Sequence, residues 1–310
     1  MNPNLTLLGR STKMTEIETA WLETNGCILC ATMNISNGSA CILISLLACM
    51  PALCQERDIN ALLMESTFKV EGVSKKNPKQ TSGGTVFFLG RPLKNDPSHQ
   101  SYVLVTAKHV LDDMDGDDAV ISLREKQANG AFRKVQFRFK FRSNGKDLYV
   151  HHPEADVAAM YLVIPIADQF PLLTANFLAD DAVLRKYEFH PGDQLSCLGF
   201  PLGAESNEMG FPILRNGYIA SYPLVPTKTI KSFLIDFHVF PGNSGGPVYF
   251  GYAARFYGGV IHPGYIRGIV GLVTQQAFST LPDFKNQPLD IGVVVPSEFI
   301  IDTIKLLPEL

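Results

Sequence analysis

Cysteine is nearly absent from most of this 310-residue sequence. Five of the six cysteines lie within the first 57 residues, which leaves Cys197 alone in the remainder. The larger part of the chain therefore cannot contain an internal disulfide bond. Cys27 and Cys30 have the Cys-x-x-Cys spacing of a metal site, but no second pair or nearby histidine completes a zinc set. We accordingly expect no bound metal.

An excess of charge of one sign is also lacking. The sequence has 27 Lys and Arg against 30 Asp and Glu, which gives a formal net charge of −3. Only 18% of the residues are charged, so the composition does not indicate binding to nucleic acid. Hydrophobic residues make up 46% of the chain, which is ample for a core, and the length suits one all-β domain with an N-terminal extension.

Basic residues are missing between Lys13 and Arg57, a segment that contains the apolar run 40–53. A run of 14 residues is short for a membrane span but matches the apolar region of a signal peptide. The run begins late in the chain, which is explained if translation starts at Met33. We therefore interpret residues 1–57 as an extension with a signal segment and expect the protein to be exported.

Three outcomes stay open for this extension. Leu46-Leu-Ala-Cys49 resembles a bacterial lipobox, in which case Cys49 is lipidated and anchors the protein to a membrane. Cleavage near Cys54 by an ordinary signal peptidase would instead give a periplasmic or secreted protein. Because the positively charged segment that normally precedes an apolar signal region is missing, a buried helix in a cytoplasmic protein is the third alternative.

From about residue 60 the sequence alternates between apolar and polar residues in short runs separated by turn residues. Such alternation predicts β-strands that bury one face. One run, 135–142, places phenylalanines on one face and Arg138, Lys140 and Arg142 on the other. We interpret this basic face as a solvated strand surface rather than as an anion-binding site.

The segment Phe240-Pro-Gly-Asn-Ser-Gly-Gly-Pro-Val248 places Ser244 in a glycine-rich turn between two apolar runs. Glycines on both sides permit backbone conformations closed to other residues and let another segment approach closely. The N–H groups of such a loop can stabilise an oxyanion that develops beside the serine hydroxyl. A glycine turn within a sheet is the alternative for this motif taken alone. Residues 242–247 resemble the nucleophile loop of trypsin-like serine proteases, which have the chymotrypsin fold.

Two other segments resemble the same family. Thr106-Ala-Lys-His109 is similar to the segment that carries the family's general base, and Asp156-Val-Ala158 is similar to the segment that carries its carboxylate. The order His109, Asp156, Ser244 is that of chymotrypsin-like enzymes and differs from subtilisins and α/β-hydrolases. The resemblance implies a triad in which His109 is the base, Asp156 orients it and Ser244 is the nucleophile.

The resemblance covers about residues 66–307 and implies an all-β fold within a domain 58–310. This fold would consist of two six-stranded antiparallel β-barrels, followed by a short C-terminal helix. The expected ranges are about 66–170 and 190–296 for the barrels and 297–307 for the helix.

Within the family, the closest resemblance is to bacterial, HtrA-type peptidases, whose Gly-Tyr-Pro-x-Gly turn is similar to Gly199-Phe-Pro-Leu-Gly203. Those proteins usually carry a PDZ module, which this sequence, ending at Leu310, is not expected to have. Asn243 stands where animal trypsins have the aspartate that binds a newly cut N-terminus. Activation by N-terminal cleavage is therefore not expected.

The implied function is that of a serine endopeptidase that hydrolyses peptide bonds through an acyl-enzyme, with a protein or peptide substrate and no cofactor. The backbone N–H groups of Gly242 and Ser244 would form the oxyanion hole. His238, six residues before the serine, lies where the family places the base of the P1 pocket. It would read an acidic or polar P1 side chain, or simply belong to the core or rim. The strand that pairs with the substrate backbone would include Leu272, Val273 and Thr274.

Two other functions stay open. The first is a non-catalytic binding module of the same fold, in which the cleft is blocked or distorted. The second is an esterase-type acyl hydrolase, although the usual order of such enzymes, with the histidine after the serine, is absent. The oligomeric state and the P1 preference do not follow from the sequence.

Overall fold

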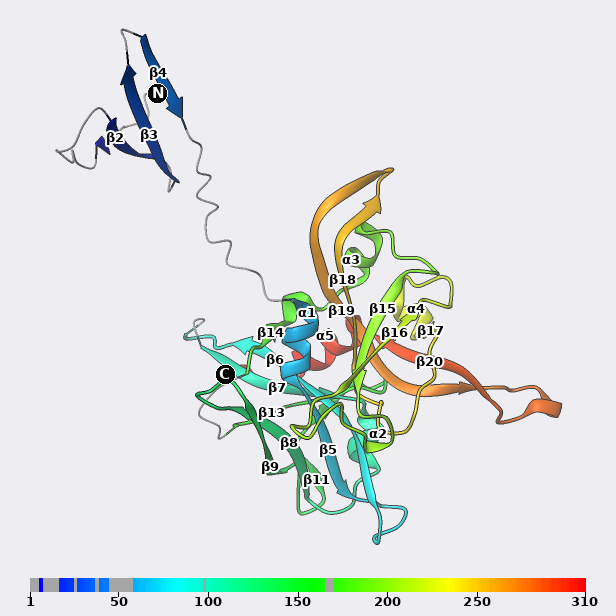
Figure 1. The fold of residues 1–310 in the computed structure, drawn as a ribbon. Coiled ribbons are helices and arrows are strands. Elements are labelled where there is room, and N and C mark those ends of the chain that lie inside the picture. Colours follow the sequence, from blue (N-terminus) through cyan, green and yellow to red (C-terminus); the bar gives the residue numbers. More distant parts are fainter. Residues whose placement is uncertain are drawn as a thin grey trace. The chain divides into compact units, whose positions relative to one another are not determined.

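The computed structural model describes residues 58–96, 99–164 and 170–310 in full and, before residue 58, the backbone of four strands. The chain divides into two compact units, Met1–Arg57 and Asp58–Leu310 (Figure 1). In the first unit, an antiparallel sheet has the strand order β1 (Thr6–Leu7), β2 (Ile17–Thr24), β3 (Cys27–Ser36) and β4 (Ser39–Ile44).

Part of the apolar run 40–53 belongs to this sheet, because the run up to Ile44 lies in β4. The buried-helix alternative does not fit these first residues of the run. The expected lipidation site Cys49 and the alternative cleavage site near Cys54 lie outside the described residues. Among the residues that the structure describes, no helix is long and apolar enough to cross a membrane.

The second unit begins with helix α1 (Ile59–Ser66) and contains two sheets. The first sheet has the spatial order β12 (Val150–His151), β13 (Ala158–Tyr161), β7 (Gln100–Thr106), β6 (Thr81–Pro92), β5 (Thr67–Val73), β8 (Asp118–Lys126) and β9 (Phe132–Lys140). Neighbours in this order are antiparallel, and β14 (Leu173–Thr174) pairs with β6 in parallel. Helix α2 (Lys108–Asp112) follows β7, and the hairpin β10 (Arg142–Ser143) and β11 (Lys146–Asp147) follows β9.

The second sheet is antiparallel throughout. Its order is β16 (Ile213–Tyr218), β15 (Gln194–Gly199), β18 (Pro247–Tyr257), β19 (Val260–Phe278), β20 (Pro288–Pro296) and β17 (Phe233–Ile235). The remaining helical segments are η1 (Ala175–Phe177), α3 (Asp181–Lys186), η2 (Pro201–Gly203), α4 (Thr227–Ile230), η3 (Pro282–Phe284) and α5 (Ser297–Lys305).

The predicted all-β fold with two barrel-like sheets and a C-terminal helix is confirmed, and the sheets are antiparallel except where β14 joins β6. The second sheet has the expected six strands, whereas the first has eight. The difference arises because the two-residue strands β12 and β14 add to the first sheet. Strands this short carry no alternation of apolar and polar residues that a sequence pattern could reveal.

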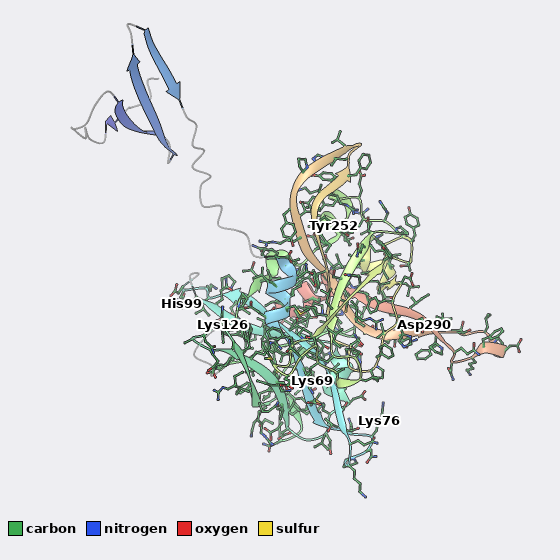
Figure 2. All side chains as sticks on the ribbon, viewed as in Figure 1. Lys69, Lys76, His99, Lys126, Tyr252 and Asp290 are labelled. Carbon is green, nitrogen blue, oxygen red and sulfur yellow. The ribbon has the colours of Figure 1, made fainter. Side chains whose placement is uncertain are left out.

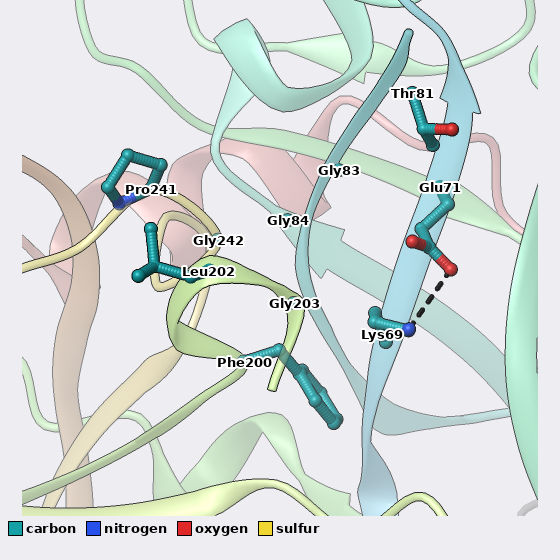
Figure 3. A pocket seen from close by; sticks show the side chains of 10 residues that line it. All are labelled: Lys69, Glu71, Thr81, Gly83, Gly84, Phe200, Leu202, Gly203, Pro241 and Gly242. Atoms are coloured by element: carbon teal, nitrogen blue, oxygen red, sulfur yellow. Dashed lines mark ion pairs between the residues drawn. The ribbon is translucent and has the colours of Figure 1, made fainter. Parts of the chain in front are cut away.

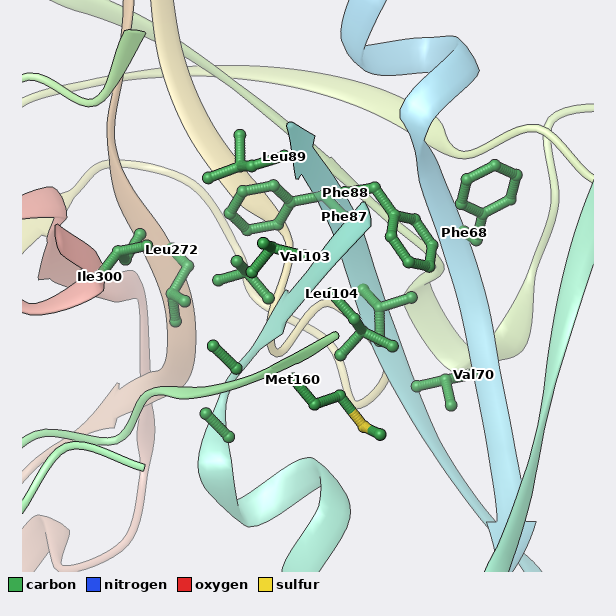
Figure 4. Packing of buried hydrophobic residues seen from close by; sticks show 14 of the residues in the cluster. Phe68, Val70, Phe87, Phe88, Leu89, Val103, Leu104, Met160, Leu272 and Ile300 are labelled. Atoms are coloured by element: carbon green, nitrogen blue, oxygen red, sulfur yellow. The ribbon is translucent and has the colours of Figure 1, made fainter. Parts of the chain in front are cut away.

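Aromatic and aliphatic side chains fill the core of the first sheet (Figure 4). Strand β6 contributes the continuous buried run 86–89, as expected for a strand covered on both faces. Phe68 of β5 packs edge-on against Phe88 of β6, with 5.7 Å between the ring centroids. Ile300 of α5 belongs to the same buried cluster, so the C-terminal helix completes this core.

Two long hairpins extend from the second sheet (Figure 1). One is formed by β18 and β19 and the other by β19 and β20. Tyr252 lies on the first of these arms, and Asp290 lies near the base of the second (Figure 2). The second arm begins beside the candidate active site.

Candidate active site

His109 and Asp156 are brought together by the pairing of two strands. His109 lies in the first turn of α2, directly after β7, and β13 pairs with β7 so that Ala158 lies opposite Thr106. Asp156, just before β13, accepts a hydrogen bond from the His109 backbone N–H at 2.9 Å. Its other carboxylate oxygen lies 2.6 Å from Nδ1 of the His109 ring. One carboxylate therefore holds both the backbone and the ring of this histidine.

The pKa of Asp156 reflects the same contacts. Burial would raise the pKa of this carboxyl, but the hydrogen bonds from the ring and backbone of His109 outweigh burial and lower it below its ordinary value. Asp156 is consequently ionised at neutral pH. An ionised partner at Nδ1 favours a proton on that nitrogen and so leaves Nε2 as the nitrogen that can accept one.

Helix α2, which carries His109, is only five residues long and is held from outside. The guanidinium of Arg142 donates to the carbonyls of Leu111 at 3.0 Å and Met114 at 2.8 Å, where the helix ends. The hydroxyl of Tyr149 donates to the carboxylate of Asp112 at 2.9 Å. These bonds satisfy groups that the end of a helix leaves unpaired and fix the position of His109.

The loop before Asp156 is shaped by a second histidine, His152. Its Nδ1 accepts hydrogen bonds from the backbone N–H groups of Glu154 at 3.1 Å and Ala155 at 3.0 Å. Its ring packs edge-on against Phe299 of α5, with 5.0 Å between centroids. Burial lowers the pKa of His152, so the ring is neutral and can accept these bonds at neutral pH.

The Ser244 loop lies against the strands that lead to His109. The backbone N–H of Thr85 in β6 donates to the carbonyl of Ser244 at 2.9 Å. Gly245 has a φ of +86°, and a Cβ there would lie 2.2 Å from Oγ1 of Thr106 and 3.1 Å from the backbone nitrogen of Ala107. Glycine is therefore required at position 245, and it lets the serine loop reach the segment directly before α2.

The Ser244 hydroxyl donates to the carbonyl of Thr274 at 2.8 Å. Within the described residues, no hydrogen bond joins this hydroxyl to the His109 ring. The structure thus unites His109 with Asp156 and brings the Ser244 loop beside them, while the serine side chain points to β19.

In the turn formed by Gly242, Asn243 and Ser244, the backbone N–H groups have different partners. Asn243 donates its N–H to the carbonyl of Phe240 at 3.0 Å, which closes the turn, and Gly242 has a φ of +96°. The N–H groups of Gly242 and Ser244, in contrast, donate to no acceptor among the described residues. A cavity of about 200 Å³ adjoins this turn and is lined by Gly242 and by Lys69 of β5, among others (Figure 3).

Of the three residues expected in the substrate strand, Thr274 is the one whose carbonyl accepts from the Ser244 hydroxyl. Leu272 and Val273 are fully buried. Val273 also uses its backbone N–H and carbonyl to bind the carbonyl of Gly246 and the N–H of Gly245. This corrects the expectation for Leu272 and Val273, because their backbone groups serve the sheet and the serine loop. In the described chain, no strand pairs with residues 274–276 on the side opposite β20, so this edge is open.

His238 is half-buried and lies next to the second arm. Its Nδ1 is hydrogen-bonded to the carboxylate of Asp290, and its ring lies 4.1 Å from that of Phe240 between centroids. Gln276 of β19 donates to the same carboxylate at 3.4 Å. The sequence did not predict the contacts of His238 with Asp290 and of Asp290 with Gln276, since these residues come from a distant hairpin and no motif signals that they meet.

No group of three or more metal-ligating side chains occurs among the residues that the structure describes. The arrangement instead provides a half-buried carboxylate on a histidine, a serine in a glycine turn and two N–H donors that have no acceptor in the described part of the chain. These are the parts required for acyl transfer through a serine.

Comparison with known proteins finds no match among curated proteins. Two solved structures are similar at low identity. A thermostable serine protease, AL20, from an extremophilic microorganism is 11% identical, with a TM-score of 0.41 over 77% of this chain and 95% of that one. The serine protease of a human pathogenic astrovirus is 13% identical, with a TM-score of 0.39 over 79% of this chain and 94% of that one.

The family model described as "Trypsin-like peptidase domain" matches residues 84–255. The matched region includes His109, Asp156 and Ser244 and spans more than half of the chain. The chain therefore belongs to the trypsin-like peptidase domain family.

Proposed function

We propose that the protein is a serine endopeptidase that cleaves peptide bonds by acyl transfer. Ser244 is the nucleophile, His109 the general base and Asp156 the residue that orients the base. The observation that carries this proposal is the double contact of Asp156, at 2.9 Å from the backbone nitrogen and 2.6 Å from Nδ1 of His109. The family membership and the order of the three residues support it.

The reaction begins when the Ser244 hydroxyl turns from the Thr274 carbonyl toward Nε2 of His109. Rotation about the Cα–Cβ bond between staggered positions accomplishes this. His109 takes the hydroxyl proton as the oxygen attacks the substrate carbonyl, and Asp156 stabilises the imidazolium that results. His109 then returns the proton to the leaving amine, and water hydrolyses the acyl-enzyme by the same steps in reverse order.

The tetrahedral intermediate needs donors for its oxyanion. The N–H groups of Gly242 and Ser244 are suited to this role because they have no acceptor within the described structure. Loss of one such donor typically costs about 10²–10³ in rate. The open edge of β19 at residues 274–276 can take the substrate as an added antiparallel strand, which positions it by backbone hydrogen bonds.

Within the family, we place the protein nearest the bacterial, HtrA-type peptidases. The support is the turn Gly199-Phe-Pro-Leu-Gly203, whose Leu202 N–H donates to the carbonyl of Pro241 at 2.6 Å. This segment therefore touches the turn that carries the proposed oxyanion donors.

A fluorophosphonate probe tests the proposal, because it labels only an activated serine. We expect covalent labelling of the wild-type protein and hydrolysis of casein, and the loss of both in Ser244→Ala. A non-catalytic binding module would be folded yet neither labelled nor active. An acyl hydrolase of the esterase type would be labelled and would cleave esters while leaving casein intact.

A further inference from the structure

Thr85 in β6 is fully buried, and each of its polar atoms is engaged around the serine loop. Its backbone N–H donates to the carbonyl of Ser244 at 2.9 Å, and its own carbonyl accepts from the hydroxyl of Thr106 at 2.7 Å. Its side-chain hydroxyl donates to the carbonyl of Gly242 at 2.7 Å. The same hydroxyl accepts from the N–H of Phe200, at the end of β15, at 3.3 Å.

The hydroxyl of Thr85 therefore fixes one of the two peptide planes beside Gly242. The other plane is fixed by Leu202, whose N–H donates to the carbonyl of Pro241 at 2.6 Å. A trans peptide is planar, with its N–H opposite its carbonyl, so this bond turns the N–H of Gly242 away from Leu202. Both peptides that flank Gly242 are thus held by groups outside the turn.

Such support matters because Gly242 lacks a side chain that would restrict it. Its φ of +96° lies in a region that glycine enters and leaves easily. A Cβ at this position would lie 2.2 Å from the carbonyl oxygen of Phe200, so the site cannot be stiffened by another residue. The N–H of Gly242 belongs to the peptide that Leu202 holds, and the conformation of Gly242 between its two peptides consequently depends on the hydrogen bonds to both.

We propose that Thr85 is a positioning residue of the oxyanion hole, which acts through its hydroxyl on Gly242. This inference rests on the proposed peptidase function. Without the hydroxyl, the carbonyl of Gly242 loses its donor in a buried place, and an unsatisfied buried group costs about 1–3 kcal/mol. The turn relieves this cost by rotating the Gly242–Asn243 peptide, which strains the adjoining peptides and carries the N–H groups of Gly242 and Ser244 out of line with the developing oxyanion.

The test compares three variants on a peptide amide substrate and on a peptide boronate, whose tetrahedral adduct with a serine mimics the oxyanion. Thr85→Val removes the hydroxyl at nearly constant shape, and Thr85→Ser keeps it. Thr67→Val is the matched control, because Thr67 is also fully buried, lies in the neighbouring strand β5, and its hydroxyl has no hydrogen-bond partner within the described residues.

We expect Thr85→Val to lower kcat by about tenfold to hundredfold, somewhat less than the loss of a complete oxyanion donor. KM should change by less than about twofold, and the affinity for the boronate should fall in parallel with kcat. Thr85→Ser should stay within about threefold of the wild type in kcat, and Thr67→Val within about twofold. Rescue by serine and the fall in boronate affinity distinguish positioning from a merely structural role.

A folded Thr85→Val with kcat within about twofold of the wild type would overturn the inference. Equal losses in Thr85→Val and Thr85→Ser, or a loss confined to KM, would overturn it as well. If Thr85→Val does not fold, Thr85→Ala and Thr85→Ser give the same comparison. The wild type is measured first: if it is neither labelled by fluorophosphonate nor active, the proposed function fails and this inference fails with it.

Discussion

At the scale of single residues, Asp156 differs from the other carboxylates near its sheet in what it contacts. Its two carboxylate oxygens contact the backbone nitrogen and the ring Nδ1 of His109. Asp147 instead pairs with the guanidinium of Arg142 at 2.9 Å. Asp168, a further acidic residue of this half of the chain, lies outside the described residues. On these geometric grounds we propose Asp156, rather than Asp147, as the orienting carboxylate.

We expect Asp156→Asn to keep the fold but to favour the wrong tautomer of His109, because an amide can donate to Nδ1. The corresponding change in trypsin costs about 10⁴ in kcat, and we expect a loss of that order. Steady-state kinetics on a peptide amide measures it, with Asp147→Asn as the control. The control should stay within about tenfold, or about 1.4 kcal/mol in barrier. A collapse in Asp147→Asn beside a nearly normal Asp156→Asn would contradict the assignment.

Substitution can also show whether His238 belongs to the P1 pocket or to the rim. Its Nδ1 is occupied by the carboxylate of Asp290, and Nε2 has no hydrogen-bond partner among the described residues, so we expect Nε2 to meet the P1 side chain. We expect His238→Ala to lower kcat/KM for substrates with an acidic or polar P1 residue by at least about tenfold relative to apolar ones. A cleavage-site profile of a peptide library measures this shift.

The control for His238 is His262→Ala. The ring of His262 stacks on Tyr257 at 3.7 Å between centroids, on the arm formed by β18 and β19. Its removal should leave the P1 profile unchanged. If the profiles of wild type and His238→Ala coincide, His238 belongs to the rim and not to the P1 pocket.

At the scale of elements, the turn before Asp156 depends on a neutral histidine. His152 accepts two backbone N–H groups at Nδ1, and protonation of that nitrogen would remove the acceptor. Burial is the main cause that lowers the pKa of His152, while Asp302 and Glu154 oppose it and Lys228 acts with it. The unfolded chain therefore binds a proton at higher pH than the folded chain does.

From this difference we expect the free energy of unfolding to contain a contribution that is fully present above the ordinary histidine pKa. That contribution is lost as the pH falls from about 6.5 through the lowered pKa of the folded state. In His152→Asn, whose amide oxygen can accept the same bonds without titrating, the loss of stability on acidification should be smaller. Urea unfolding at a series of pH values between about 8 and 5 measures both proteins. Identical pH slopes would show that His152 does not contribute.

The elements also show what a sequence can and cannot reveal here. His109, Asp156 and Ser244 lie in contiguous motifs, so each could be predicted from its own few residues. Thr85 and Asp290 could not, because their roles come from contacts with segments more than fifty residues away in the chain. Leu272 and Val273 were expected to meet the substrate, but the bulge between Val273 and Gln275, where the register of β19 on β20 shifts, is set by tertiary packing.

At the scale of the whole molecule, a buried arginine joins the two sheets. Nη1 of Arg124, on β8, donates to the carbonyl of Gly210 in the loop between β15 and β16 at 2.6 Å. Its Nη2 donates to the carbonyls of Met64 at 2.9 Å, at the end of α1, and of Thr67 at 2.6 Å, at the start of β5. The guanidinium lies between the rings of Phe68 and Phe211, at 4.1 and 4.4 Å from their centroids.

Burial lowers the pKa of Arg124 to about 9, so the side chain is still charged at neutral pH and depends on these carbonyls and rings.

We expect Arg124→Met to lower the free energy of unfolding by about 3–5 kcal/mol, because several buried carbonyls lose their donor at once. Arg124→Lys should recover little of this, since an ammonium can neither reach three carbonyls in one plane nor stack between two rings. Urea unfolding measures both, with Arg133→Met as the control, because Arg133 is exposed and pairs with Glu125 at the surface. The control should leave the unfolding midpoint near that of the wild type, and an Arg124→Met protein with an equally unchanged midpoint would show that this contact does not hold the sheets together.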